Sequence, residues 1–216
     1  MTFAALKPQI LAALMLALLS ACAIEADRGS RLAADGQYPI NNLNEATVDA
    51  IISACNHPKG ASDSQLSEAE CRLIVAGSAI RESSWDVNKS CEAWGAPHDP
   101  ACGLTQSRHS DSQAVGLNCS PGERSVHGYQ CNALTGLRNL RCKADNGVSC
   151  DVWGSGRTLE VGIRKHLGNP NQAALNSYRY DMQVVYMRED VRQRLGVDAS
   201  RVRAWDSLLA APQELF

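Results

Sequence analysis

A glutamate that ends an apolar helical stripe is the feature of this sequence that best suits proton-transfer chemistry. The stripe consists of Cys71, Ile74, Val75, Ser78 and Glu82, spaced so that all five lie on one face of a helix. The Glu82 carboxyl should therefore point toward the core or into a cleft. Burial and the negative end of the helix dipole both favour the protonated carboxyl, the form that a general acid needs near neutral pH. By itself, the pattern also fits a surface or structurally paired glutamate.

The residues around and after Glu82 carry a more specific signal. They are Glu82–Trp85 (Glu-Ser-Ser-Trp), Trp94–Ala96 (Trp-Gly-Ala) and Gly103–Gln106 (Gly-Leu-Thr-Gln). Together they resemble the signature of lytic transglycosylases related to goose-type lysozyme. That signature is Glu-Ser with an aromatic residue two positions on, then Gly-Ala, then Gly-Leu-Met-Gln. Thr105 stands where the family has Met.

The resemblance implies an activity and roles for individual residues. Glu82 would be the catalytic acid and base, and Ser83 would orient its carboxylate. The residues implied to line the sugar cleft are Gly103, Leu104 and Gln106. The strong part of the resemblance covers about residues 67–107, and a weaker part extends to about residue 195. The implied fold is mainly α, of the lysozyme-like α+β kind.

The gap between the two halves of the signature is longer than usual and contains Cys91 and Cys102. A disulfide between them would close off the extra loop, so that Glu82 and Gln106 could face each other. Two tryptophans, Trp85 and Trp94, have flat faces that could stack on sugars, but they fit the core or a cleft wall equally well.

Two later segments resemble the family more weakly. Residues 132–140 are similar to its Asn-Ile-x-x-Gly-x-x-x-Leu helix, and residues 174–178 to its Ala-Leu-Ala-Ala-Tyr-Asn motif. Tyr178 would then hydrogen-bond the substrate or Glu82, although a core aromatic on a late helix is nearly as common an explanation. Arg179 stands where the family has Asn, which puts part of that substrate contact in question.

The reaction follows from the number of carboxylates available. Most glycosidases use two, on opposite sides of the sugar. Asp86 lies beside Glu82 on a continuing helix and not across from it, and Asp99 and Asp111 lie in loops that the sequence does not place. Enzymes of the resembled family need one Glu, which protonates the glycosidic oxygen and then deprotonates the muramoyl C6 hydroxyl. The prediction is a lytic transglycosylase that cleaves the MurNAc-GlcNAc β-1,4 bond and forms 1,6-anhydro-MurNAc.

Three other functions stay open at this point. A hydrolytic muramidase would use the same cleft with water as the nucleophile. A catalytically inactive, peptidoglycan-binding envelope lipoprotein is favoured by the departures at Thr105 and Arg179. A disulfide-rich structural or inhibitor module fits the cysteines but leaves the match from Glu82 to Gln106 unexplained. The sequence does not distinguish endo from exo cleavage.

The first residues predict export and lipidation. Lys7 precedes an apolar run over residues 10–19, too short to span a bilayer, and the run ends in Leu19-Ser20-Ala21-Cys22. These four residues resemble a lipobox, which implies a signal peptide over residues 1–21 and diacylation of Cys22. An ordinary signal peptide cut near Ala21 is the alternative. Residues 22–39 are small and polar, as expected of a tether to a domain over residues 40–216.

These features predict the location and partners of the chain. Ala23 follows the lipidated cysteine, where an Asp would favour the inner membrane, so we expect the periplasmic face of the outer membrane. The expected partners are peptidoglycan glycan strands and the membrane, through the lipid on Cys22. An envelope or secretion-system assembly is a further candidate. The formal net charge is −2 and there is no basic run, so nucleic acid is not expected.

Eight cysteines remain once Cys22 is assigned to the lipobox. They are Cys55, Cys71, Cys91, Cys102, Cys119, Cys131, Cys142 and Cys150. An even number in an exported chain predicts up to four disulfides, whose connectivity is left open. A structural metal site using His57 or His98 is the alternative, but no two cysteines have zinc-site spacing, and no cofactor is expected. Because all eight precede residue 151, helix packing must hold the last third.

The hydrophobic spacing predicts a single helical domain with Cys-rich loops. Ser67 and Glu70 fit a capping box at the start of the helix that carries Glu82. Residues 88–128 and 142–156 are expected to be ordered loops, with a small hairpin as an option and a Cys142–Cys150 bond closing the second. The predicted helices cover residues 46–54, 67–85, 132–140, 157–167, 172–180, 182–195 and 200–210.

Overall fold

The computed structural model describes residues 40–62, 66–91, 98–142, 158–167 and 171–210. These ranges form one mainly helical domain, as the sequence predicts, and contain no strand beyond an isolated bridge between Cys102 and Ser107. The helices are η1 (Ile40–Asn42), α2 (Glu45–Asn56), α3 (Glu68–Ser83), α4 (His109–Ala114), α5 (Val126–Cys142), α6 (Leu159–His166), α7 (Gln172–Met187), α8 (Glu189–Arg194), η2 (Ala199–Arg201) and α9 (Trp205–Ala210).

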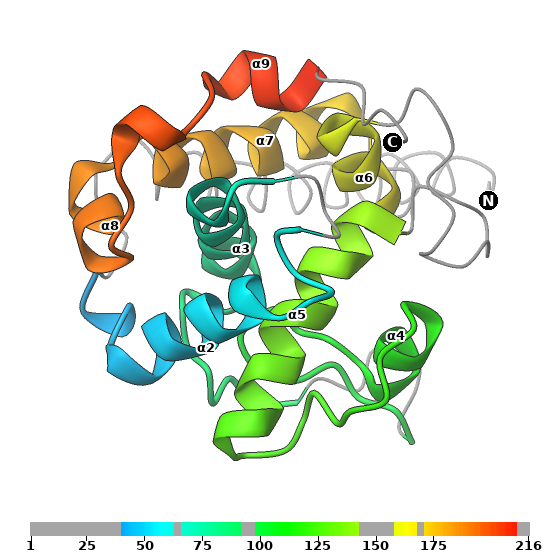
Figure 1. The fold of residues 1–216 in the computed structure, drawn as a ribbon. Helices are drawn as coiled ribbons and strands as arrows, with labels where there is room; N and C mark the ends of the chain where they lie inside the picture. Colours follow the sequence, from blue (N-terminus) through cyan, green and yellow to red (C-terminus); the bar gives the residue numbers. More distant parts are fainter. Residues whose placement is uncertain (1–39, 63–65, 92–97, 143–157, 168–170, 211–216) are drawn as a thin grey trace, which may run out of the picture.

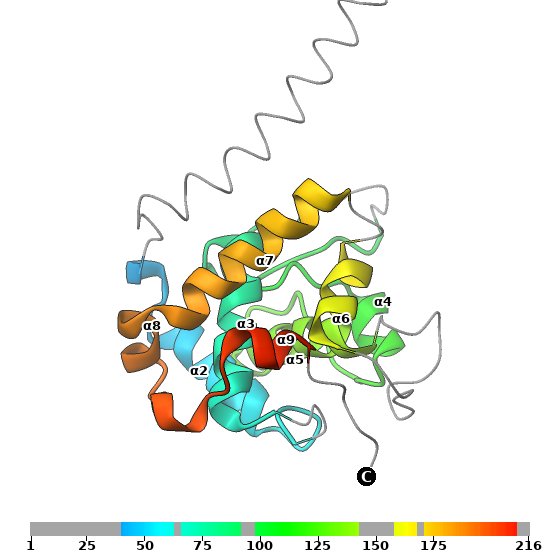
Figure 2. The same cartoon turned by 90° about the horizontal axis from the view of Figure 1, so that it is seen from above.

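Helix α3 is the centre of the domain. It packs against α2 and α5 on one side and against α7 on the other, and Figure 1 shows it nearly end-on between them. Seen from above, α7 crosses over α3, with α6 and α9 lying together beside them (Figure 2). Most of α3 is buried, including Leu73, Ile74 and Val75, because it has neighbours on nearly every side.

The ends of α3 are set by local interactions. The Ser67 side chain accepts a hydrogen bond from the Glu70 N–H at 3.1 Å, and the Glu70 carboxylate accepts one from the Ser67 N–H at 2.9 Å, so the predicted capping box is confirmed. The helix ends at Ser83, two residues before the predicted end. Ser84 adopts the left-handed conformation with φ 54°, which stops the helix and places Glu82 in its last turn.

Helices α3 and α7 approach each other closely at a glycine. A Cβ on Gly77 would lie only 3.2 Å from the Cα of Met182, so a larger side chain would push the two helices apart. Tyr178, one turn earlier in α7, is consequently held against Ser78. This contact is what brings the end of α3 together with residues about a hundred positions later in the chain.

The predicted break in α7 is wrong. We expected helices over residues 172–180 and 182–195, separated at Asp181, but the helix continues to Met187. Asp181 is buried and forms an ion pair with Arg81 of α3, so this charged residue belongs inside the packed helix. The chain leaves the helix at Arg188, whose backbone is extended, and α8 follows.

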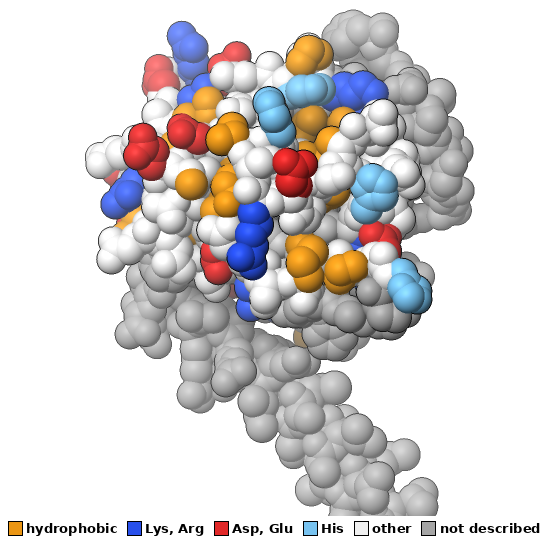
Figure 3. Space-filling view, turned by 90° about the horizontal axis from the view of Figure 1, so that it is seen from below, with side chains coloured by type: hydrophobic (Ala, Val, Ile, Leu, Met, Phe, Trp, Pro, Cys, Tyr) orange, Lys and Arg blue, Asp and Glu red, His pale blue; other side chains and the backbone are white. Residues whose placement is uncertain are grey.

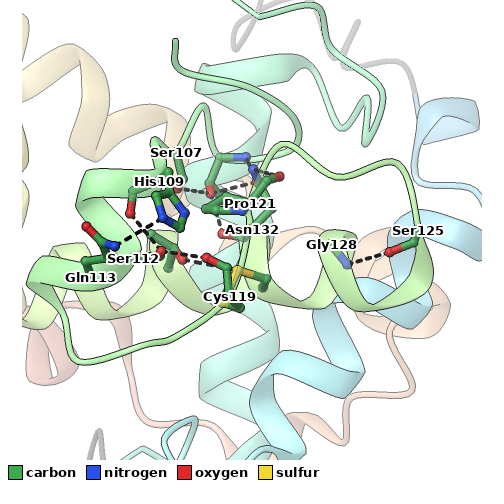
Figure 4. The surroundings of a disulfide bond; sticks show 12 residues. Ser107, His109, Ser112, Gln113, Cys119, Pro121, Ser125, Gly128 and Asn132 are labelled. Atoms are coloured by element: carbon green, nitrogen blue, oxygen red, sulfur yellow. Dashed lines mark hydrogen bonds between the residues drawn. A yellow bond between two sulfur atoms is a disulfide. The ribbon is translucent and has the colours of Figure 1, made fainter. Parts of the chain in front are cut away.

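Other boundaries also differ from the predicted ones. Residues 88–128, expected to be loop, contain the short helix α4, and α5 begins at Val126 instead of residue 132. The Ser125 hydroxyl accepts a hydrogen bond from the Gly128 N–H at 3.1 Å and so caps the start of α5 (Figure 4). A single serine in a loop-like segment does not by itself predict a helix start. The predicted helix over residues 200–210 is divided into η2 and α9.

Three disulfides connect the described part of the chain. They are Cys55–Cys71, Cys91–Cys102 and Cys119–Cys131, and the second is the bond that the sequence analysis offered as a way to close the extra loop. The first joins α2 to α3, and the third joins the preceding loop to α5 (Figure 4). The suggested Cys142–Cys150 bond, the signal peptide, Cys22 and the tether lie outside the described residues.

The face on the side of α2, α4 and α5 carries side chains of several kinds. In its described part, basic, acidic and histidine side chains are dispersed among hydrophobic ones and do not gather by charge (Figure 3). Within the ranges that the structure describes, no helix has the length and apolar character needed to span a bilayer.

Candidate functional site

The Glu82 carboxyl lies where α3, α6 and α7 meet. Its Oε1 accepts a hydrogen bond from the Tyr178 hydroxyl at 3.2 Å and lies 3.1 Å from Nε2 of His166. The Glu82 side chain is 22% exposed, so the carboxyl is held at one oxygen and still reaches solvent. Across the described residues, Oε2 has no hydrogen-bond partner.

Tyr178 is both a core aromatic and a partner of Glu82, so the two explanations that the sequence left open are both correct. Its ring is buried, and its hydroxyl lies 2.9 Å from that of Ser78. Burial, and then the charge of Glu82, raise the pKa of the Tyr178 phenol well above its ordinary value. The phenol therefore stays neutral and acts as a donor to the carboxyl.

His166 is a site residue that the sequence analysis missed. It is the last residue of α6, its side chain is 15% exposed, and its ring lies edge-on to Tyr178 with centroids 5.9 Å apart. Its Nδ1 is buried without a hydrogen-bond partner in the described structure. A single histidine at the end of a helix forms no sequence motif that would predict a contact with Glu82. Only the packing of α6 against α7 reveals that contact.

The charged residues beside the site pair away from Glu82. Arg81 binds Asp181 and the Ser177 hydroxyl, as expected from its direction on the helix. Arg179, which replaces the Asn of the resembled family, forms an ion pair with Glu160 at 2.9 Å. Neither guanidinium is therefore directed at the Glu82 carboxyl.

Ser83 and Trp85 stabilise the end of α3. The Ser83 hydroxyl donates to the Ala79 carbonyl at 3.0 Å, within the helix, whereas the Glu82 carboxyl accepts from the Tyr178 hydroxyl and lies within hydrogen-bond distance of His166 Nε2. Trp85 is fully buried and its indole N–H donates to the Ala76 carbonyl, so it belongs to the core and has no free face for a sugar. Trp94 lies outside the described residues.

The loop over residues 102–107 is adjacent to the segment that follows Glu82. The Gly103 N–H donates to the Lys89 carbonyl at 3.1 Å, and the Cys91–Cys102 disulfide joins the same two segments. Gly103 has φ +69°, and a Cβ there would lie 2.8 Å from the Asn132 amide nitrogen, so this position requires glycine. Leu104 is buried in the core, where its side chain supports the loop from beneath.

Thr105 is integrated into a buried hydrogen-bond network. Its N–H donates to Asn132 Oδ1 at 2.7 Å, and its hydroxyl contacts both Ser107 and the Asn132 backbone. The Asn132 amide donates in turn to the carbonyls of Cys102 and Pro121 (Figure 4). The replacement of the family's Met by Thr is therefore matched by a satisfied polar core.

Gln106 has a left-handed backbone with φ 46°, and its amide donates to the Gly103 carbonyl at 2.9 Å. Its Oε1 is buried without a partner in the described part of the chain. The structure thus brings Gly103, Leu104 and Gln106 together in one tight turn. The expectation that Gln106 faces Glu82 across a sugar cleft remains a prediction.

The other candidate carboxylates accept hydrogen bonds from nearby backbone N–H groups. Asp86 accepts from the Asn88 N–H, Asp99 accepts from the N–H groups at the start of α4, and Asp111 accepts from the Arg108 N–H. None of these three interactions involves Glu82. Each carboxylate therefore has a local capping function in the structure.

The cysteines that the alternative metal site would use are occupied in disulfides. Cys55 and Cys102, the cysteines nearest to His57 and His98, are both in disulfides and provide no thiolate. The His57 Nδ1 accepts a hydrogen bond from the Lys59 N–H. Where side chains are described, no cluster of three or more metal-ligating residues occurs.

Comparison with protein-family models, with curated proteins and with solved structures found no significant match. The resemblance to lytic transglycosylases therefore depends on the residues quoted above, and the function is put forward below as a proposal.

Proposed function

We propose that this protein is a peptidoglycan lytic transglycosylase in which Glu82 is the single acid and base. The observation that carries the proposal is the environment of its carboxyl. Tyr178 and His166 contact Oε1, whereas Oε2 has no partner among the residues that the structure describes and the side chain is partly exposed. A carboxyl fixed in this way can deliver a proton to a bound sugar and take one back at the same atom.

In the proposed reaction, the protonated Glu82 gives its proton to the glycosidic oxygen between MurNAc and GlcNAc. The bond from C1 to that oxygen breaks through an oxocarbenium-like transition state. The resulting carboxylate removes the proton from the C6 hydroxyl of the same MurNAc, and O6 bonds to C1. The products are a 1,6-anhydro-MurNAc end and a free GlcNAc hydroxyl, and Glu82 is protonated again without consumption of water.

The positions of the remaining carboxylates favour this reaction over hydrolysis by a pair of carboxylates. Asp86, Asp99 and Asp111 each cap nearby backbone, and each would have to leave that role to act as a nucleophile or base. The intramolecular reaction makes no such demand. A single carboxylate with hydrogen-bond donors on one oxygen is sufficient for both proton transfers.

We also propose that the enzyme acts at the periplasmic face of the outer membrane. This part of the proposal comes from the lipobox-like residues ending at Cys22 and the polar residues 22–39 after it. The lipid would keep the domain near glycan strands, and an envelope or secretion-system assembly would be a natural partner for an enzyme that opens the wall locally.

The masses of soluble products from purified sacculi test the proposal. The mature protein should release anhydromuropeptides, each lighter than the corresponding reducing muropeptide by one water, and Glu82→Gln should release them about 10²- to 10⁴-fold more slowly. Reducing muropeptides from the wild type would instead identify a muramidase. Binding to sacculi without any soluble product would identify a non-catalytic peptidoglycan-binding protein, and both outcomes would overturn the proposal.

A further inference from the structure

We infer that His166 is a positioning residue that acts on Glu82 as a neutral hydrogen-bond donor and does not take up the catalytic proton. The inference rests on the proposed function of Glu82 as the acid. It is carried by two contacts of one imidazole ring: Nε2 lies 3.1 Å from Glu82 Oε1, and Nδ1 is buried without an acceptor among the described residues.

The surroundings of the ring determine its protonation. In the neutral imidazole with its hydrogen on Nε2, this N–H donates to Glu82. Nδ1 is then an unprotonated acceptor, and a buried acceptor without a donor costs less free energy than a buried charged N–H without an acceptor. The imidazolium would add a charged N–H at Nδ1 for which the described residues offer no acceptor, and burying an unpaired charged donor is strongly unfavourable. The geometry therefore selects the neutral ring.

Nearby charges do not reverse this selection. The edge-on neighbour of the ring is Tyr178, whose phenol is neutral. Arg81 and Arg179 are paired with Asp181 and Glu160. The carboxylate that would attract an imidazolium is Glu82 itself, and it is uncharged in the form that begins the reaction.

This arrangement has a consequence for catalysis. If the proton shared by the pair were on His166, Glu82 would be a carboxylate and could not protonate the glycosidic oxygen. A neutral ring that donates through Nε2 does not take that proton from the carboxyl. Two neutral donors, Tyr178 and His166, occupy Oε1, so Oε2 carries the proton toward the substrate and receives the next one.

Nitrogen NMR of the mature protein labelled with ¹⁵N-histidine tests the protonation directly. The two ring nitrogens of His166 are assigned as the signals that disappear in His166→Gln. Near neutral pH we expect one protonated nitrogen, Nε2, and one unprotonated nitrogen, Nδ1. Two protonated nitrogens, or the opposite tautomer, would overturn the inference. This measurement does not depend on activity.

Kinetics on soluble glycan strands test the positioning role. His166→Gln places an amide donor near the position of Nε2, whereas His166→Leu has none. We expect the Gln variant to keep kcat within about 3-fold and the Leu variant to lose about 10- to 100-fold in kcat with KM nearly unchanged. Equal losses in both variants, or a loss confined to KM, would contradict the role. An inactive wild type with a neutral ring would instead reject the proposed function alone.

Discussion

Different interactions stabilise two parts of the molecule, one rich in disulfides and one without them among its described residues. The disulfide-bonded part (described residues within 40–142) contains all three disulfides and the buried Asn132 network. The C-terminal part (described residues within 158–210) has no disulfide among its described residues and is held by packing, such as the Tyr186–Trp205 contact at 5.1 Å, and by ion pairs. This segment contains no cysteine, and ion pairs supplement the helix packing on which the last third was expected to rely.

The proposed site spans the boundary between these two parts. Glu82 belongs to the disulfide-bonded part, whereas Tyr178 and His166 belong to the C-terminal part. The acid is therefore joined to its hydrogen-bond donors by noncovalent packing alone. The disulfides secure the loop over residues 102–107, and α7 secures the carboxyl.

The largest expected effect follows from removing the acid itself. Glu82→Gln should lower the rate of anhydromuropeptide release by about 10²- to 10⁴-fold, because the amide cannot exchange the proton. Folding should be retained, since the side chain is partly exposed and the amide has the same shape. Product release measured by liquid chromatography gives the rate.

The matched control for that variant is Asp86→Asn, four residues along the chain. Asp86 is exposed, and its oxygen caps the Asn88 N–H, a role that an asparagine oxygen can take over. Activity close to that of the wild type is expected. A loss at Asp86 as large as that at Glu82 would mean that two carboxylates share the chemistry.

The next largest expected effect is on stability, from a substitution that creates a cavity in the C-terminal part. Met182 is fully buried in α7 and lies against Gly77 of α3, so Met182→Ala should lower the free energy of unfolding by about 2–5 kcal/mol. Urea denaturation measures the change. The exposed neighbour Gln183→Ala serves as the control, and a similar loss in both variants would show that packing at this interface is not what holds the two parts together.

Removal of a disulfide should affect stability more than catalysis. Replacing both Cys119 and Cys131 by Ser opens a bond with a sequence separation of 12 and should cost about 2–3 kcal/mol of stability. The contacts of Glu82 with α6 and α7 do not involve this bond, so kcat of the folded fraction should be unchanged. A fall in kcat under conditions where the variant is fully folded would place the disulfide in the catalytic apparatus.

The smallest expected effect is a change in the pH dependence of stability. Burial opposes ionisation of Glu70, but hydrogen bonds from Arg203 and Ser67 outweigh it and lower the pKa of Glu70 below its usual value of 4.5. Because the folded-state pKa is the lower one, the stabilisation is complete above the unfolded-state pKa. It is lost as the pH falls from there through the folded-state pKa.

Glu70→Gln should therefore make the acid-side decline in stability shallower, measured as the free energy of unfolding at a series of pH values below about 5. The control is Glu68→Gln, whose ion pair with Arg72 is solvent-exposed and should matter little. An unchanged decline in the Glu70 variant would show that this pair does not connect the start of α3 to the C-terminal part.

Local signals in the sequence predicted the elements of the site well. The capping box at Ser67 and the stripe ending in Glu82 located α3 to within two residues at its C-terminus. The Cys91–Cys102 bond was one of the pairings that the sequence left open. These features depend on residues close together in the chain, where spacing and side-chain type decide the outcome.

The errors occurred where distant residues decide local structure. Asp181 appeared to interrupt a helix because its partner, Arg81, is about a hundred residues away. For Trp85 the sequence left a sugar-stacking face and a core position open, and the structure places it in the core, where the Ala76 carbonyl accepts from its indole N–H. The helix α4 was missed because its capping groups, Asp99 and Asp111, lie in a segment rich in turn-forming residues.

The amino-acid sequence by itself determined a single helical domain and the helix whose last turn carries the Glu82 carboxylate. The family resemblance offered Tyr178 as a partner of that carboxylate, and only the tertiary structure fixed this contact and added His166. Helical periodicity specifies which face of a helix is buried, but it does not specify what is packed against it. The choice of Tyr178 and His166 as partners of Glu82 came from the close approach of α7 to Gly77 and from the packing of α6 beside it.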